Sequence, residues 1–63
     1  MMYKLRIYKQ RGRDKGKLDK EEFFKTEIDA IERYNELRNP DNFAFNPTFW
    51  SGKGDDWERV EGY

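Results

Sequence analysis

The chain has 63 residues and a mass of 7.7 kDa, which is enough for one small domain over residues 1–63 and too little for two. Charged residues make up 41% of the chain and aromatic residues 17%, and because disordered chains are poor in aromatics, this composition favours a folded domain with an aromatic core. The absence of Cys and His removes disulfides, thiolate chemistry, the commonest general base and the commonest metal ligand, so we expect neither enzyme activity nor a cofactor.

The formal net charge is zero, but the two parts of the chain differ strongly. Residues 1–20 carry eight basic and two acidic side chains, whereas residues 21–63 carry five basic and eleven acidic ones. Such asymmetry is typical of a face that binds nucleic acid or another protein. It also fits a fold in which the two parts neutralise each other. The sequence leaves both interpretations open.

The first predicted element is a strand over residues 3–9, in which apolar and charged residues alternate. The alternation predicts two faces, one with Tyr3, Leu5 and Ile7 and the other with Lys4, Arg6 and Tyr8. Residues 10–16 have turn composition, and residues 17–24 predict a second strand that returns antiparallel to the first. Glu21 and Glu22 are then expected to lie across from basic residues of the first strand.

A helix is predicted to begin after Thr26 and to run to about Arg38. Thr26 is a suitable N-cap, and Glu27 and Asp29 place negative charge in the first turn, where the helix dipole favours it. The Pro at position 40 is expected to stop the helix.

The predicted helix has one apolar stripe and one charged face. The stripe consists of Ala30, Ile31, Tyr34 and Leu37, with Ile28 at its margin. On the charged face, Asp29 and Arg33 have the spacing of an ion pair, whereas Glu32 and Glu36 have the same spacing and repel.

After a turn at residues 40–42, Phe43 and Phe45 alternate as in a strand. Asn46 and Pro47 are expected to interrupt this strand before residues 48–50 become extended again, and Pro47 indicates a sheet edge or a bulge.

Residues 51–56 have turn composition, and residues 57–63 predict the last strand. The expected fold is therefore α+β, with the order β-β-α-β-β and the helix packed on a small antiparallel sheet. The N-terminal residues lack the continuous apolar run of a signal peptide, and no run reaches the ~18 apolar residues of a membrane span, so a cytoplasmic location is expected.

Two short motifs near the C-terminus superficially suggest chemistry. The acids Asp55, Asp56, Glu58 and Glu61 lack the spacing of a calcium loop, and we interpret Asp55 and Asp56 as part of a solvated turn. The Gly-Lys-Gly run at residues 52–54 lacks the remaining glycine and the Ser or Thr of a phosphate-binding loop, which favours a hairpin turn.

The basic N-terminal hairpin is the candidate nucleic-acid site. Its cations are suited to phosphate and one tyrosine is suited to stacking on a base: Lys4, Arg6, Lys9, Arg11 and Arg13, with Tyr8. The pI of about 6.2 and the nearby acids count against this interpretation, which we keep as the alternative.

The C-terminal region is dense in aromatics, and these residues are expected to supply most of the core: Phe43, Phe45, Phe49, Trp50, Trp57 and Tyr63. One or two of Trp50, Trp57 and Tyr63 are expected to be exposed, because they flank a Gly-rich turn and the end of the chain. Exposed Trp and Tyr are typical interface anchors, so these three residues, with Asp55 and Asp56, are the candidate protein-binding residues.

The layout, in particular the run Phe24-x-Thr26-x-x-x-Ala30 that introduces a short helix after a hairpin, resembles that of many small proteins encoded by bacteriophages and bacterial mobile elements. The resemblance spans most of the chain and identifies no binding residues. It implies a modulator or inhibitor that docks on a host protein. The sequence therefore predicts a non-enzymatic protein-binding module, with nucleic-acid binding and self-association through an open sheet edge as alternatives.

Overall fold

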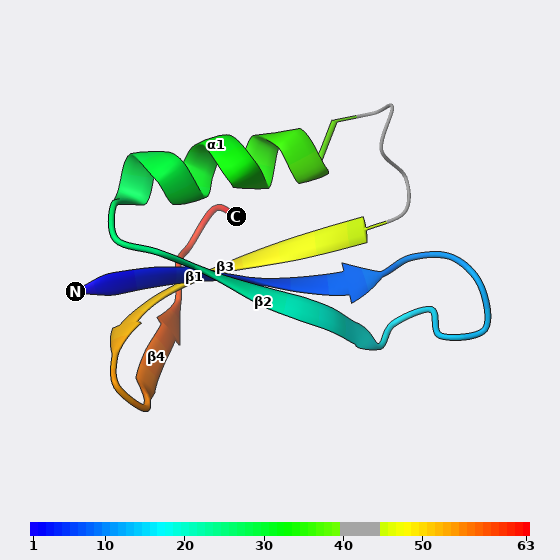
Figure 1. Ribbon diagram of the computed structural model, residues 1–63, viewed down its shortest axis with the longest axis horizontal. Helices are drawn as coiled ribbons and strands as arrows, with labels where there is room; N and C mark the ends of the chain where they lie inside the picture. The colour runs from blue at the N-terminus through cyan, green and yellow to red at the C-terminus, as the bar shows by residue number, and fades with distance from the viewer. Residues whose placement is uncertain (40–44) are drawn as a thin grey trace.

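The computed structural model describes residues 1–39 and 45–63, which form two strands, a helix and two further strands (Figure 1). The elements are β1 (Met2–Lys9), β2 (Leu18–Phe24), α1 (Glu27–Leu37), β3 (Phe45–Lys53) and β4 (Asp56–Arg59). The α+β class expected from the sequence is what the structure shows. The turn predicted at residues 40–42 and the strand position predicted for Phe43 lie outside the described part of the chain.

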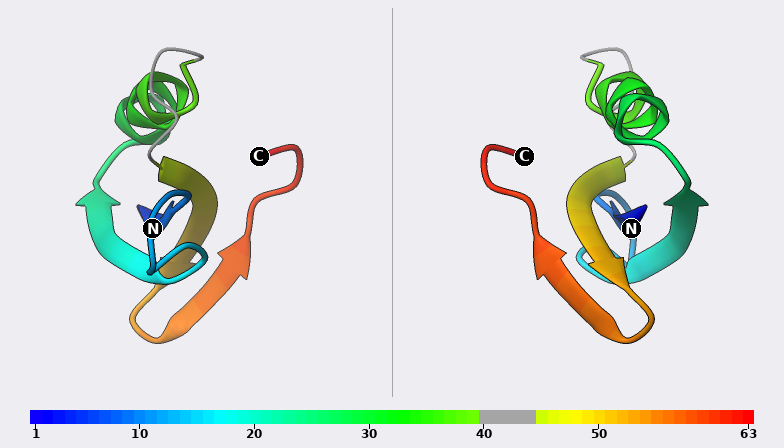
Figure 2. Two further views of the ribbon diagram at one scale, coloured as in Figure 1. Left: turned by 90° about the vertical axis from the view of Figure 1, so that its right-hand side faces the viewer. Right: turned by 90° about the vertical axis from the view of Figure 1, so that its left-hand side faces the viewer.

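The four strands form one antiparallel sheet in the order β2-β1-β3-β4. β1 therefore lies inside the sheet, between its sequence neighbour β2 and the distant β3. α1 lies over one face of the sheet (Figure 2). On the other face no described helix lies, but the end of β3 and β4 curl beneath the sheet, so that Trp57 of β4 reaches Phe23 of β2 (Figure 1). The face opposite α1 is called the open face below.

The core lies between α1 and the sheet. Leu5, Ile7 and Phe49 are fully buried, and α1 contributes Ala30, Tyr34 and Leu37. The predicted alternation of β1 is confirmed, because Leu5 and Ile7 face the helix while Lys4 and Arg6 pair with a carboxylate on the open face. The stripe predicted for the helix is confirmed at its centre, whereas Ile28 at its margin is 69% exposed.

The N-cap predicted at Thr26 is confirmed, whereas Pro40, which was expected to stop the helix, lies outside the described residues. The Oγ1 of Thr26 accepts a hydrogen bond from the backbone N–H of Asp29 at 3.3 Å, as an N-cap does. The helix ends at Leu37, and the backbone N–H of Arg38 donates to the carbonyl of Tyr34.

The predicted interruption at Asn46 and Pro47 is wrong, because β3 is continuous from Phe45 to Lys53. The backbone N–H of Val60 donates to the carbonyl of Phe49, so the polar groups of Phe49 point away from β1. This direction alternates along a strand, and the nitrogen of Pro47 therefore also points away from β1, where β4 does not reach. Pro47 thus lies at a sheet edge, as expected, and removes no hydrogen bond from the ladder.

The predicted last strand is too long. β4 ends at Arg59, the N–H of Val60 makes one further hydrogen bond to β3, and the chain then leaves the sheet with Val60 and Tyr63 packed against the core. The ring of Tyr63 packs edge-on against Tyr34 and Phe49, with ring centres 5.1 and 5.0 Å apart. Burial of these two side chains explains why the chain stops following β3.

Within residues 1–39 and 45–63, no helix has the length and apolar character needed to cross a membrane.

Candidate binding surfaces

The open face is built by every second residue of each strand. The register places Phe23, Lys4, Trp50 and Arg59 in one row across β2, β1, β3 and β4. The next rows place Glu21 beside Arg6 and Thr48, and Met2 beside Gly52 and Trp57. This face therefore combines aromatic rings with three cations and one carboxylate.

Gly52 makes room for the indole of Trp57 on the open face. A Cβ at position 52 would lie 2.9 Å from Cδ2 and 2.8 Å from Cα of Trp57, and it would also collide with the carbonyl oxygen of Asp56. The indole reaches the ammonium of Lys4, 4.5 Å from its ring centre, and the ring of Phe23, whose centre is 6.1 Å away. Trp57 is half-buried, while Phe23 is 58% exposed. Phe23, Trp57 and Lys4 are called the aromatic cluster below.

Glu21 holds two neighbouring cations on the open face. Its Oε2 lies 3.0 Å from Nζ of Lys4 and 3.4 Å from Nε of Arg6. The guanidinium of Arg6 also lies 5.7 Å from the ring centre of Tyr8. The expectation that Glu21 lies across from the cations of the first strand is thus confirmed, and the charge asymmetry of the sequence is neutralised at this point.

Trp50 is held in place by a polar chain on the open face. Its Nε1 donates to Oγ1 of Thr48 at 2.9 Å, and Oγ1 of Thr48 donates to the carbonyl of Arg6 at 3.2 Å. Trp50 pairs with Lys4 in the register, so its half-buried ring contributes to the open face and not to the core under α1.

Residues 9–17 close the first hairpin and are called the basic loop. They carry five cations and one carboxylate. The backbone N–H of Lys9 donates to the carbonyl of Lys17, and the N–H of Gly16 donates to the carbonyl of Lys9. The N–H of Lys17 in turn donates to the carbonyl of Asp14 at 2.9 Å. Gly12 and Gly16 have φ values of 84° and 90°, which favour glycine. Hydrogen bonds and glycine conformations therefore define the shape of this loop.

A shallow depression of about 430 Å³ lies where the basic loop meets the sheet. It is lined by Tyr8, Lys9, Gln10, Lys15, Gly16 and Asn46. The Nζ of Lys9 is 3.8 Å from Asp14 and 3.9 Å from Asp19, whereas Lys15 makes no ion pair within the described residues. The sequence-predicted Tyr8 and Lys9 are therefore brought together, while Arg11 and Arg13 lie exposed in the loop itself.

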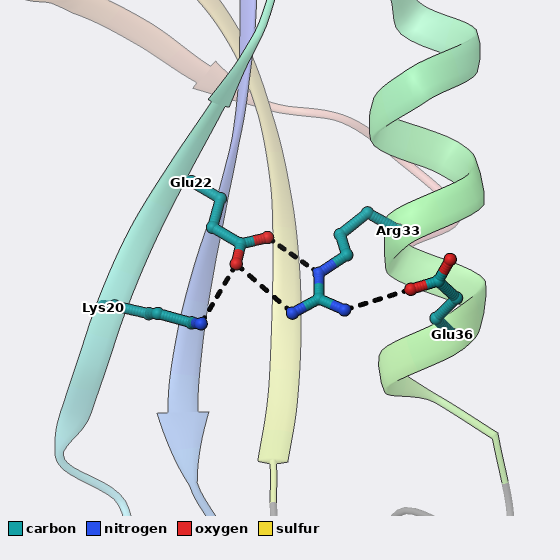
Figure 3. A network of polar contacts seen from close by, with 4 residues as sticks. All are labelled: Lys20, Glu22, Arg33 and Glu36. Atoms are coloured by element: carbon teal, nitrogen blue, oxygen red, sulfur yellow. Dashed lines mark hydrogen bonds and ion pairs between the residues drawn. The ribbon is translucent and has the colours of Figure 1, made fainter.

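Glu22 was also expected to lie across from a basic residue of the first strand, but this is wrong, because it pairs with Leu5 in the register. Its side chain faces the helix and joins the sheet to α1 (Figure 3). Its two carboxylate oxygens accept hydrogen bonds from Nε and Nη2 of Arg33 at 2.8 and 3.3 Å, and Lys20 lies 3.1 Å away. The hydrogen bonds from Arg33 lower the pKa of Glu22, and the same hydrogen bonds raise the pKa of Arg33. Arg33 also donates to Glu36, so its expected pairing with Asp29 is wrong. The reason is that Arg33 points toward β2, where Glu22 offers both oxygens.

The other candidate protein-binding residues differ in position. Asp55 and Asp56 are exposed at the turn between β3 and β4, as expected of a solvated turn. Tyr63 belongs to the core-packed residues and is not an exposed anchor. Trp50 and Trp57 lie on the open face.

Phe23 is the surface aromatic that sequence reasoning missed. Its neighbour Phe24 packs against the core, and adjacent strand residues face opposite sides of a sheet, so the pair at residues 23–24 already required one exposed ring. The register places Phe23 beside Lys4 and thus on the open face.

Within the described residues, no group of three His, Cys, Asp or Glu side chains could hold a metal ion. Comparisons with protein-family models, with curated proteins and with solved structures find no match for this chain.

Proposed function

We propose that the protein is a non-enzymatic binding module that docks on another protein through its open face. The observation that carries the proposal is the exposed ring of Phe23, which lies beside Trp57 on the sheet face opposite α1. Large aromatic side chains at such positions are the usual anchors of protein interfaces.

The charges around the aromatic cluster suggest the chemistry of the partner. Among the described residues that the register places on the open face, the three cations Lys4, Arg6 and Arg59 outnumber the one carboxylate, that of Glu21, so these residues carry an excess of positive charge. A partner with an apolar side chain ringed by carboxylates complements this face, since interface charges guide encounter and orientation while buried aromatic anchors supply most of the affinity. The resemblance to small phage proteins favours a host protein as the partner and modulation or inhibition as the outcome.

Affinity capture from the lysate of the native host tests this proposal, with nuclease present throughout. Wild-type protein, Phe23→Ala and Ile28→Ala serve as baits. Ile28 is the matched control because it is also apolar and more exposed, at 69%, but lies on α1. Circular dichroism verifies that all three baits are folded.

The expected result is one protein that the wild type and Ile28→Ala enrich equally and that Phe23→Ala loses. A photo-crosslinking residue at position 23 should join the same protein, whereas one at position 28 should not. Equal capture by all three baits contradicts the proposal, and recovery of only a second copy of this chain favours self-association instead.

A further inference from the structure

We propose that the basic loop is a second, separate binding site, and that it takes the phosphate groups of single-stranded nucleic acid. The site consists of Lys9, Arg13, Lys15 and Lys17 with Tyr8 at its border. It is distinct from the aromatic cluster, because Phe23 and Trp57 pair with the opposite end of β1 and β3.

The first argument is the distribution of neutralised charge. Along the strands each cation near the centre of the hairpin has a carboxylate partner: Lys4 and Arg6 have Glu21, and Lys20 has Glu22. In the basic loop, Asp14 lies 3.8 Å from Lys9 and 3.4 Å from Lys17, and Asp19 of β2 lies 3.9 Å from Lys9. Arg13 and Lys15 make no ion pair within the described residues, and both are exposed. Positive charge is therefore concentrated at one end of a molecule 34 Å long.

The second argument is the defined shape of the loop. Four backbone hydrogen bonds hold residues 9–17, among them the bond from Gly16 N–H to the carbonyl of Lys9 at 2.7 Å. Because the cations are displayed from a loop whose backbone is already ordered, little backbone entropy remains to be lost when a ligand binds.

The third argument distinguishes a nucleic acid from an acidic protein. Residues 9–17 contain no apolar side chain, so a protein docking here would find a single aromatic ring, Tyr8 at the border of the loop, and no aliphatic anchor. Phosphate contacts need no such anchor, since counterion release drives them. Tyr8 lines the depression beside Lys9 and Lys15, which places a ring suited to base stacking next to two cations suited to phosphate.

Fluorescence anisotropy with a labelled oligo-dT of about 12 nucleotides measures this binding directly. The double variant Arg13→Glu/Lys15→Glu removes the site. Lys25→Glu/Lys53→Glu is the matched control, because it changes the net charge equally at the opposite end of the sheet, where β2 and β3 end (Figure 1). Circular dichroism and thermal unfolding verify that both variants are folded.

At about 100 mM salt, the loop variant is expected to lose at least about tenfold in affinity, while the control changes by less than about threefold. The control changes little because charges farther apart than ~10 Å are screened at this salt concentration. With about three phosphates neutralised, the logarithm of the wild-type affinity should fall with the logarithm of salt with a slope of about −2. Phe23→Ala should bind the oligonucleotide like the wild type, so failure of this proposal is separable from failure of the protein-docking proposal. No wild-type binding at about 50 mM salt, or equal losses in the two double variants, overturns the proposal.

Discussion

Glu22 of β2 and Arg33 of α1 form a two-point ion pair, with Nε and Nη2 of the guanidinium 2.8 and 3.3 Å from the two carboxylate oxygens. The pair links the helix to the edge strand of the sheet, beside the buried core. Because two parallel hydrogen bonds fix both planes, it orients α1 more firmly than a single contact would. Lys20 and Glu36 extend it at either end (Figure 3).

This ion pair predicts a specific loss of stability in acid. The pKa of Glu22 in the folded protein is lowered below its ordinary value of 4.5, mainly by the hydrogen bonds from Arg33. A lowered pKa contributes stability above the ordinary value, and this contribution disappears as the pH falls through the folded-state pKa. Glu22→Gln should therefore be less stable than the wild type at pH 7 by about 1 kcal/mol, at the upper end for partly exposed pairs. Urea unfolding at several pH values should show the difference between the two proteins shrinking as the pH falls below 4.5 and through the lowered folded-state pKa. A difference that is constant with pH contradicts this account.

Phe49 and Phe23 should respond in opposite ways to truncation. Phe49 is fully buried between α1 and the sheet, so Phe49→Ala should cost about 3–5 kcal/mol, which is enough to unfold so small a domain. Phe23→Ala should change the free energy of unfolding by less than about 1 kcal/mol, because its ring is mostly exposed. Circular dichroism during urea unfolding measures both. If Phe23→Ala also unfolds the protein, the ring is a structural residue and not an interface anchor.

Gly52→Ala should displace Trp57. The added Cβ would meet Cα and Cδ2 of Trp57 at distances below 3.0 Å, and most of the atoms it meets are backbone or ring atoms that cannot yield cheaply. We expect a loss of about 1–3 kcal/mol and a change in tryptophan fluorescence as the indole leaves Lys4. Gly12→Ala is a useful control, since a Cβ there meets no atom within 4 Å and only the backbone is strained. Unchanged fluorescence in Gly52→Ala would show that the packing around Trp57 is looser than described.

Tyr63 should stabilise the fold through its ring. Tyr63→Ala removes the edge-on contacts to Phe49 and Tyr34 and should cost about 2 kcal/mol in thermal or urea unfolding. Tyr63→Phe keeps the ring and should be close to the wild type. Equal losses in the two variants would assign the effect to the hydroxyl and contradict the packing argument.

Much of the fold could be predicted because local patterns and tertiary packing agree. The alternation of β1, the cap at Thr26 and the stripe around Tyr34 each predict the face that the structure buries. The errors occur where tertiary packing overrides local preference. Pro47 sits inside a continuous strand because its nitrogen faces an open edge, and the chain leaves β4 early because Val60 and Tyr63 are drawn to the core.

The candidate surfaces could be predicted less well. Which side of the sheet the helix covers decides whether an aromatic ring is core or surface, and this depends on the register between strands distant in sequence. Trp50 and Trp57 were expected at an interface because they flank a turn. Their actual place on the open face has a different cause, which is that Trp50 pairs with Lys4 and Trp57 pairs with Gly52. Placing Phe23 on the open face likewise requires the register between β1 and β2.

The central position of β1 also determines when the chain can fold. β1 pairs with β2 soon after the first hairpin is made, but its other edge stays open until β3 arrives, and that ladder joins residues as far apart as Met2 and Gly52. Closing so long a loop costs entropy before any contact offsets it. Until β3 is in place the core lacks Phe49, its largest fully buried side chain, so we expect the first hairpin and α1 to be unstable on their own. Folding is therefore expected to be a single cooperative step that waits for the last third of the chain, both in refolding and during synthesis on the ribosome.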